Sequence, residues 1–569
     1  MKKYLTIIGV LALSAAVFAG CNEPAGGGAE ATTGGAAATG DAADTAAATP
    51  TDDGPAVMSA PGVFPIVDRP VHMDIVMPDV PYIGVLNDNA FAAWYEEKTG
   101  VVMNFIEVPS DHVTERVNLM LAAGDLPDIF MNTVVDADLN GPRGIFIPLN
   151  DLIDSYGLET PRIFSENDGL PGMITHVDGN IYALPNINDC FHCRRTFRAW
   201  INTDWLDEFN LDMPQTTDEF EHVLRTWRDA GRIPMSAAGT GGPQQLAWPF
   251  LLNSFMYFHQ GLNQYMYLDN GTVNFAAFNP EFREGLRWIR HLVEDGLIEP
   301  MALTQTGDQL LQLGADPSGP QVGIAPSFVW WQMVPGDDVS PDLRSRSFEA
   351  LSPLQGPRGV RISPLTHRAA MRDFVVITSA AERPDVAFRW LDGLYSLEVT
   401  MRSQLGEPEI GWTEAPAGSV GINGLPALYT QLWFESDADA LGANTRMDNI
   451  MLADRSSPFR LGEMADWDDP ETMFAQEPRL FRITNEFYEP FAHDYMSVPP
   501  LAFSEAEQDA LGLINPQIHD HMMESITLFL SGGLCLDNDW DGFIATLYSI
   551  GVEDYVGIRQ IAFDRQFGN

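Results

Sequence analysis

Lysine is almost absent from this sequence: among 569 residues it occurs only at Lys2, Lys3 and Lys98. Arginine supplies nearly all of the positive charge, and 32 basic residues stand against 79 acidic ones, which gives a formal net charge of -47. A field of that sign repels nucleic acid and anionic lipid headgroups, so the composition argues against nucleic-acid binding. An acidic, lysine-poor surface suits a protein that works outside the cell in salt, although genome base composition also favours arginine over lysine in some organisms.

Several signatures of catalytic and nucleotide sites are missing too. The sequence has no Gly-x-x-x-x-Gly-Lys phosphate loop, no His-Glu-x-x-His motif and no Gly-x-Ser-x-Gly turn. Asp537, Asp539 and Asp541 begin like a calcium loop, but the twelfth position is Tyr548 instead of Glu, so we predict a helix N-terminus there. We therefore predict no cofactor and no metal site, while the many acids leave open a carboxylate pair of the kind that glycosidases use.

Long apolar runs are also scarce, and the longest lies at the N-terminus. A positive head at residues 1–3 precedes an apolar run at 5–18, and small residues then lead to Cys21. This order predicts a secretory signal that is too short to span a membrane. The last residues before Cys21 resemble the lipobox of bacterial lipoproteins, with Phe18 in place of the usual leucine. The resemblance implies that Cys21 becomes the first mature residue and carries lipid; a plain secretory signal with an unmodified cysteine is the alternative.

The segment that follows supports an anchor. Residues 22–62 consist mainly of Ala, Gly, Thr and Asp, with very few large apolar side chains. Such a segment cannot bury enough surface to fold, so we expect a flexible tether between the lipid and a folded body.

From residue 71 onward, short apolar runs alternate with amphipathic ones. The expected strands are His72–Met77, Val101–Val108 and Ile129–Met131. The expected helices are Ala90–Lys98, which Gly100 ends, and a second one that Ser110 or Asp111 caps and Gly124 ends. This alternation predicts an α/β fold with a largely parallel sheet, in which ligands bind at the carboxyl ends of the strands.

The same part of the chain resembles the extracytoplasmic oligosaccharide-binding lipoproteins of ABC importers. The matching segments follow the order of that family and are Asn118–Ile129, Ile181–Pro185, Asn202–Phe220, Leu292–Ile298, Trp390–Ser396 and Gly551–Arg565. The resemblance implies a two-lobed type II periplasmic-binding-protein fold with a ligand cleft between the lobes. Lobe one would hold residues 63–187 and about 363–405, and lobe two 188–362 and about 406–569.

The implied function is capture of a sugar, expected to be an oligosaccharide, with no chemical reaction. Hinge closure buries the ligand, and the closed monomer docks on an ABC permease in the membrane. A secreted glycoside hydrolase or lyase is one alternative. A ligand-binding sensor component, or a binder of another polar solute, is a second alternative that the sequence leaves open.

Tryptophans supply the candidate sugar contacts, because a flat ring stacks on the C–H face of a sugar at little entropic cost. Trp330 and Trp331 follow a predicted strand, Val322–Ala325, and we expect at least one of them to face the cleft. Trp248, after a Gly-rich loop, and Trp412 are further candidates.

Charged side chains supply the candidate polar contacts. Asp128 precedes a strand, where it either binds ligand or caps a turn. Arg194, Arg195 and Arg198 cluster after the predicted lobe crossing. They form either a solvated face or a grip on the carboxylate of an acidic sugar, and we include Arg198 among the ligand contacts.

Three cysteines, Cys190, Cys193 and Cys535, are also candidates for a specific chemical role. Cys190 and Cys193 flank His192, a spacing that allows a disulfide, two free thiols or a metal site, and one of the pair could instead bridge Cys535. Outside the cell a disulfide is the natural state.

Overall fold

The computed structural model describes residues 55–568 apart from 81–82, 134, 168, 261–264, 337–342, 368–369 and 433–443. Residues Ala56–Asn569 form one compact unit, and Met1–Pro55 are a separate one. The predicted signal, Cys21 and nearly all of the predicted tether therefore lie outside the described residues. Every helix that the structure describes is too short or too polar to span a bilayer.

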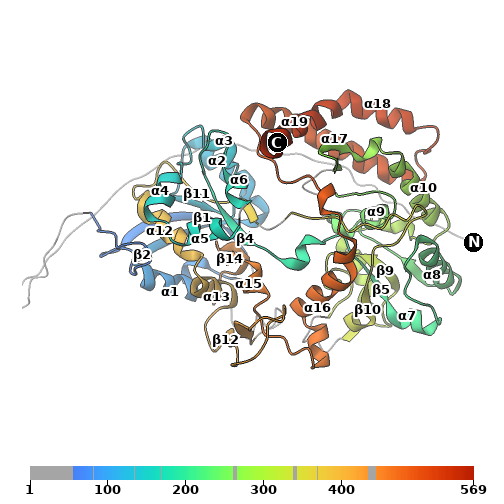
Figure 1. The fold of residues 1–569 in the computed structure, drawn as a ribbon, viewed down its shortest axis with the longest axis horizontal. Coiled ribbons are helices and arrows are strands. Elements are labelled where there is room, and N and C mark those ends of the chain that lie inside the picture. The colour runs from blue at the N-terminus through green and yellow to red at the C-terminus, as the bar shows by residue number, and fades with distance from the viewer. Residues whose placement is uncertain are drawn as a thin grey trace, which may run out of the picture. The chain divides into compact units, whose positions relative to one another are not determined.

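Six strands build the first sheet (Figure 1). In order across the sheet they are β14 (Asp454–Arg455), β4 (Leu184–Asn188), β11 (Ala370–Ile377), β3 (Ile129–Met131), β1 (Val71–Asp79) and β2 (Val101–Pro109). β1 pairs in parallel with β2 and β3, whereas β11 runs antiparallel to β3 and β4. The parallel part confirms the strand–helix–strand arrangement that the sequence predicts.

Two helices connect the parallel strands, and their ends follow local chemistry. α1 (Ala90–Thr99) ends at Gly100, whose φ of 73° is a left-handed conformation that glycine adopts without strain. α2 (Val113–Ala123) ends at Gly124 in the same way, as predicted. Its predicted N-cap is wrong: Ser110 lies in a short 3-10 turn, and its N–H donates to Asp79 Oδ1 at 2.9 Å, which ties the turn to β1 instead.

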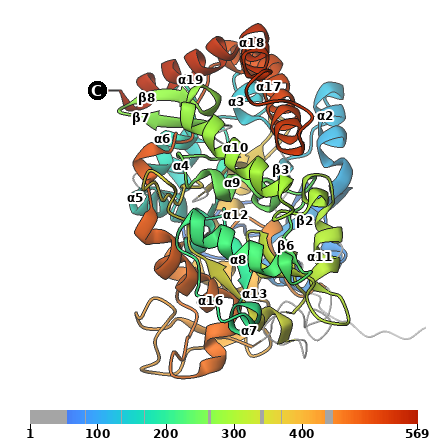
Figure 2. The same cartoon turned by 90° about the vertical axis from the view of Figure 1, so that its right-hand side faces the viewer.

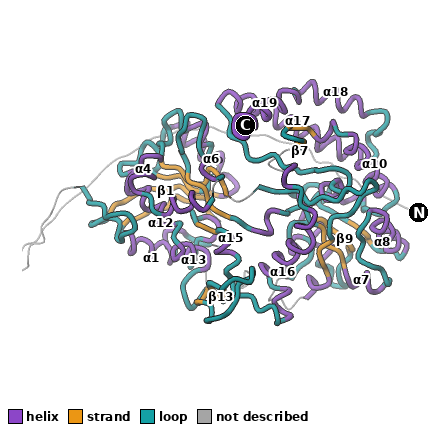
Figure 3. The backbone as a smooth tube through the Cα atoms, in the orientation of Figure 1, coloured by secondary structure: helices purple, strands orange, loops and turns teal. Residues whose placement is uncertain are grey.

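A second sheet has four strands, and Figure 3 shows the two groups of strands in orange. Their order is β10 (Phe348–Leu351), β5 (Ala199–Asn202), β9 (Val322–Pro326) and β6 (Ile233–Met235). β5 is antiparallel to β10 and β9, and β6 is parallel to β9. Two separate hairpins join β7 (Met266–Asp269) to β8 (Thr272–Phe275) and β12 (Trp412–Glu414) to β13 (Tyr429–Gln431).

Helices cover both sheets. Those that follow strands of the first sheet are α3 (Ala137–Asn140), α4 (Asn150–Tyr156), α5 (Glu159–Glu166), α6 (Leu170–Ile174), α12 (Pro384–Leu394), α13 (Leu397–Leu405) and α15 (Ser457–Arg460). The others are α7 (Thr203–Glu208), α8 (Thr217–Asp229), α9 (Ala247–Leu252), α10 (Pro280–Glu294), α11 (Gly307–Gly314), α16 (Gln476–Ile483), α17 (Glu505–Ser531), α18 (Trp540–Ile550) and α19 (Val552–Phe567). α17 packs against α10, α18 and α19 (Figure 2).

Each sheet has its own hydrophobic core. Residues such as Ile75 and Leu184 belong to the core of the first sheet, whereas Trp200, Ile526 and Phe529 belong to that of the second. The C-terminal helices therefore bury their apolar faces with the second sheet. The lobe boundaries stay a prediction. That prediction gave the residues after about 405 to lobe two, but β14 lies in the first sheet, where it pairs with β4 at the sheet edge.

Two stretches of chain connect the sheets, and they position the site described next. The first crossing, residues 189–198, runs from β4 to β5, and the second crossing, residues 352–367, leads from β10 toward β11 (Figure 1).

Candidate functional site

The first crossing meets the carboxyl ends of strands from both sheets. It continues directly from the carboxyl end of β4, and its far end enters β5 at Ala199, which pairs with Pro326 at the carboxyl end of β9. Ligands of α/β proteins bind outside the carboxyl ends of strands, so this junction is the natural place to look for a site.

Strand alternation gives the entry to this crossing two faces. Side chains alternate along β4, so Ile187 and Asp189 lie on one face and Asn188 lies on the other. β14 pairs in register, Asp454 with Ile187 and Arg455 with Asn188, so Arg455 shares the face of Asn188. We call the Asn188 side the polar face and the Ile187 side the cavity face.

On the polar face, Glu477 of α16 collects several partners. Its Oε1 accepts from Arg460 Nη2 at 2.5 Å, and its Oε2 lies 3.4 Å from His192 Nδ1. Arg460 also donates to Asn188 Oδ1 at 3.0 Å. Burial alone would raise the pKa of Glu477, but the positive charge of Arg460 and the contact with His192 hold that pKa well below its usual range. Burial lowers the pKa of His192, so its imidazole is neutral at neutral pH.

An aromatic side chain lies beside this network. Phe328, just past the carboxyl end of β9, is partly exposed, and its ring centroid is 5.7 Å from that of His192. The Arg198 guanidinium carbon is 5.4 Å from the same ring. Phe328 therefore offers an aromatic surface at the junction, and sequence reasoning missed it because attention fell on the tryptophans that follow it.

Arg198 itself is a structural residue. Its side chain is fully buried, and Nη2 donates to His192 O and to Thr484 Oγ1, both at 2.6 Å. Burial lowers its pKa to about 10, so it stays charged at neutral pH. The predicted ligand contact is corrected here: with no exposed surface, Arg198 holds the first crossing against the π-turn that contains Thr484 instead of facing solvent.

Arg455 is the second residue that sequence reasoning missed. Its Nε and Nη1 atoms are buried and have no hydrogen-bond partner among the described residues, and the Nε of Arg460 is in the same state. Burial, and then the nearby charge of Arg460, lowers the pKa of Arg455 to about 10. Buried donors without partners cost about 1–3 kcal/mol each, which makes them candidates for ligand contact. Nothing in the local sequence marks Arg455; only the pairing of β14 with β4 places it here.

The cavity face borders a cavity of about 740 Å³. Its lining is largely apolar and comes from α6, both crossings, residues 499–500 and the end of the chain. The residues that line it are Asn167, Gly169, Leu170, Gly172, Met173, Ile187, Asp189, Cys190, Arg194, Leu365, Thr366, His367, Pro499, Pro500, Gln566 and Phe567. Burial lowers the pKa of His367, whose Nε2 is 2.9 Å from Ser497 Oγ.

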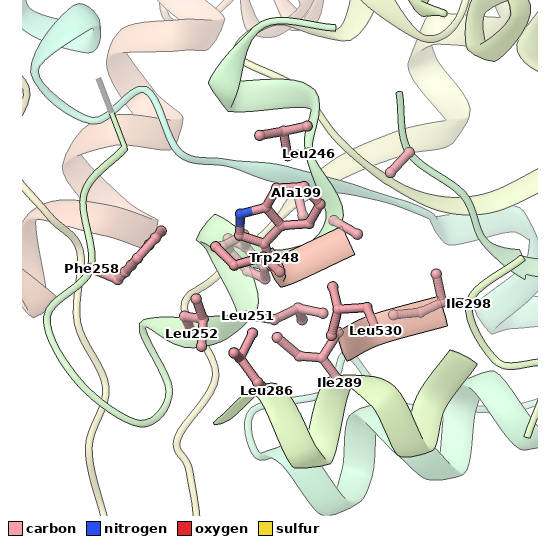
Figure 4. Close-up of a cluster of buried hydrophobic side chains, with 14 of the residues drawn as sticks. Ala199, Leu246, Trp248, Leu251, Leu252, Phe258, Leu286, Ile289, Ile298 and Leu530 are labelled. Carbon is pink, nitrogen blue, oxygen red and sulfur yellow. The ribbon is translucent and has the colours of Figure 1, made fainter. Parts of the chain in front are cut away.

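The predicted tryptophans fall into two groups. Trp248 is fully buried in α9, where its Nε1 donates to Gln260 Oε1 at 3.0 Å, and Figure 4 shows it among core side chains such as Leu251. Trp330 is 1% exposed and packs edge-on against Trp200. Trp248 is therefore corrected as a ligand contact, because a ring without exposed surface cannot stack on a sugar. Of the pair at 330–331, only Trp331 can still meet the expectation that at least one ring faces the cleft.

Trp331 is partly exposed and stays a prediction. So does Trp412, which is partly buried in β12 and whose Nε1 donates to Gly406 O at 3.1 Å. Asp128 accepts from the Asp74 N–H at 2.8 Å, and burial raises its pKa. That contact lies at the start of β3, so the structure does not bring Asp128 to the first crossing.

The cysteines adopt one of the predicted states. Cys190 and Cys193 form a disulfide within the first crossing, and Cys535 is free, so the alternative bridge to Cys535 is wrong. Cys190 Sγ also lies 3.2 Å from His192 Nε2. The predicted helix N-terminus near Asp541 is confirmed, because Asp541 lies in the first turn of α18.

The sequence and the fold agree with one protein family. Residues 84–401 match the bacterial extracellular solute-binding proteins, and the chain belongs to that family. The chain is 26% identical to the fructooligosaccharide ABC transporter substrate-binding protein FusA of Streptococcus pneumoniae serotype 4 (strain ATCC BAA-334 / TIGR4), over 85% of this chain and 88% of FusA.

Solved structures share the fold. A structure of S. pneumoniae FusA in complex with kestose covers 87% of this chain and 99% of its own, with a TM-score of 0.69 and 23% identity. An HMO-binding solute-binding protein from Bifidobacterium longum infantis ATCC 15697 covers the same shares, with a TM-score of 0.72 and 20% identity. These similarities confirm the predicted two-lobed α/β fold of type II.

Proposed function

We propose that this protein captures an oligosaccharide outside the cytoplasm and delivers it, chemically unchanged, to the permease of an ABC importer. The sugar binds at the first crossing between the two sheets, and hinge closure buries it. Lipid on Cys21 and the segment 22–62 keep the body near the membrane, as the sequence predicts.

One observation carries the proposal: the polar face of the first crossing combines an aromatic surface with unsatisfied donors. Phe328 presents a partly exposed ring, and Arg455 presents buried N–H groups that have no partner in the described part of the chain. A sugar offers a C–H face to the ring and hydroxyl acceptors to the donors. Both groups lie near the carboxyl ends of strands, where ligands of this kind of fold bind.

Similarity to FusA supports the class of ligand. The name of that relative states that it binds fructooligosaccharides for an ABC transporter, and it aligns with 85% of this chain. A sugar ligand is therefore the first class to test, beginning with kestose.

Calorimetric titration of residues 56–569 against a panel of oligosaccharides tests the proposal. The panel contains fructooligosaccharides, milk oligosaccharides and galacturonate oligomers, and each sugar is analysed by chromatography afterwards. We expect saturable binding and recovery of intact sugar. Cleaved sugar indicates a glycoside hydrolase or lyase instead, and no binding across the panel removes the case for a sugar ligand.

A matched pair of variants locates the site. Phe328→Ala removes the ring beside His192, and we expect it to weaken binding by about tenfold, since an aromatic contact contributes roughly 0.5–1.5 kcal/mol beyond its buried area. Phe278→Ala is the control, because Phe278 is 41% exposed but packs against Tyr548 of α18. Equal effects of the two substitutions contradict a site at the first crossing.

A further inference from the structure

Arg455 projects from the edge strand of the first sheet onto the polar face. Its strand partner Asp454 faces the other way, where it pairs with Arg162 at 2.9 Å. The register of β14 with β4 sets Arg455 beside Asn188, at the entry to the first crossing. The fold thus places one arginine where the proposed ligand binds, and gives it no carboxylate within ion-pair distance among the described residues.

The acid of this face is partly buried and already has partners. Glu477 is shared between Arg460 and His192. Arg460 still has an unsatisfied Nε, and so does Arg198. His192 is neutral, and among the described residues the carboxylate of Glu477, whose side chain is 20% exposed, is the one that pairs with any of the guanidinium groups of Arg198, Arg455 and Arg460. The polar face therefore carries a surplus of positive charge in a protein whose net charge is -47.

Other polar groups near Arg455 do not cancel this surplus. Asp189 lies on the cavity face and accepts from Ser457 Oγ. Asp448 and Tyr429 favour the charged form of Arg455, but neither makes a hydrogen bond with its guanidinium in the described structure. The Nε and Nη1 donors are buried without partners, but Arg455 as a whole is partly exposed, unlike Arg198. Low local polarity strengthens a hydrogen bond between such a donor and a charged partner.

We propose that the captured oligosaccharide carries an anionic group, a carboxylate of the kind found on uronic acids, and that Arg455 binds it. The inference deepens the proposed function and rests on it. A carboxylate satisfies the free donors of Arg455 and balances the surplus charge in one step. A neutral sugar satisfies the donors only through hydroxyl oxygens and leaves the charge unbalanced.

The negative charge of the whole protein does not oppose this ligand at close range. At physiological ionic strength, charges more than about 8 Å apart in solvent are largely screened, so the distant acids mainly slow the approach of the sugar. The local surplus acts on the bound state, where water is excluded.

A pair of trisaccharides that differ only in charge tests the inference on residues 56–569. Trigalacturonate carries the carboxylates, and carboxyl-reduced trigalacturonate is the same sugar without them. We expect trigalacturonate to bind at least about tenfold more tightly, because hydrogen bonds to charged groups contribute about twice as much as neutral ones. Tighter or equal binding of the reduced sugar overturns the anionic class, while the proposed function survives as long as some sugar binds.

Three variants assign the effect to Arg455. Arg455→Met removes the donors and the charge at similar length, and we expect the preference for trigalacturonate to disappear while binding of the reduced sugar changes by less than about threefold. Arg455→Lys keeps the charge and should retain part of the preference. Arg287→Met is the control, because Arg287 lies on α10 and pairs with exposed Asp537. If Arg455→Met folds poorly, Arg455→Lys and the two sugars on the unmodified protein still test the role of Arg455. The assignment is contradicted if Arg455→Lys leaves the preference for trigalacturonate entirely unchanged. It is also contradicted if Arg287→Met abolishes that preference.

Discussion

The polar face and the cavity face have opposite character although they lie on the two sides of the same entry to the first crossing. The polar face carries Glu477, Arg460 and Arg455, with charges that are only partly balanced. The cavity face borders about 740 Å³ that is lined mainly by side chains such as Leu170, Met173 and Leu365. Six polar side chains, among them Asp189, Arg194 and His367, also line that cavity, but the unsatisfied donors of Arg455 lie on the polar face. The proposed function assigns ligand recognition to the polar face, and the predictions below test whether the cavity face mainly affects stability.

The largest effect is expected from Glu477, the partly buried acid that pairs with buried Arg460 on the polar face. Glu477→Gln leaves Arg460 and its neighbours without a counter-charge, and we expect the free energy of unfolding to fall by about 3 kcal/mol, as when one partner of a buried pair is removed. Urea unfolding followed by circular dichroism measures the loss. Glu471→Gln is the control, because Glu471 pairs with Arg346 on the surface and its substitution should cost much less. Similar losses for both variants would mean that the polar face is solvated.

The stability lost through Glu477→Gln should depend on pH, and this dependence tests whether the charge of Glu477 stabilises the polar face. Since the pKa of Glu477 is depressed in the folded protein, its contribution to stability is present above the ordinary pKa of a glutamate and is lost as the pH falls through the lower, folded value. The stability difference between the unmodified protein and Glu477→Gln should therefore shrink as the pH is lowered from 6 towards 3. A difference that stays constant over this range contradicts a charge-based role for Glu477.

Reduction of the disulfide is expected to have the next largest effect, because Cys190 borders the cavity face and contacts His192 of the polar face. The bond closes a very short loop, so its loss should lower the free energy of unfolding by about 2 kcal/mol. Unfolding is measured with and without a phosphine reductant on a Cys535→Ser background, which removes the free thiol. Sugar affinity should fall as well; a reduced protein with unchanged affinity would show that the polar face keeps its geometry without the bond.

A glycine on the cavity face gives the smallest expected effect. Gly172 lies inside α6, and a Cβ built on it meets no atom within 4 Å. Gly172→Ala should therefore stabilise the protein by about 0.5–1 kcal/mol through helix propensity. Thermal unfolding measures the gain, and calorimetry should find sugar affinity unchanged within about twofold. A large loss of affinity would indicate that the ligand binds at the cavity face and would contradict the assignment of binding to the polar face.

Much of the fold could be predicted from local sequence. The strand, helix and strand that end at Pro109 follow from short apolar runs and from Gly100, which ends α1 in the left-handed conformation expected of it. The α-helix that begins at Trp540 also follows from its acidic first turn. These features depend on residues within one or two turns of each other.

The candidate site could not be predicted in the same way, because it depends on pairing across the chain. β14 has two residues, too few for any periodic pattern, and yet it carries Arg455 to the position beside Asn188. Trp248 was misassigned because α9 is buried on all sides, which removes the amphipathic pattern that distinguishes a core face from an open one. Of the pair at 330–331, the sequence could not decide which ring packs on Trp200.

The burial of the tryptophans around the second sheet determines which structural changes alter their intrinsic fluorescence. Trp200, Trp227, Trp248 and Trp330 are all less than 2% exposed and belong to one core. Their emission is therefore dominated by an apolar, rigid environment that changes when the core unfolds and hardly at all when a sugar reaches the first crossing. The fluorescence of these four rings reports unfolding, so a fluorescence change on sugar binding would have to come from partly exposed rings such as Trp331 or Trp412.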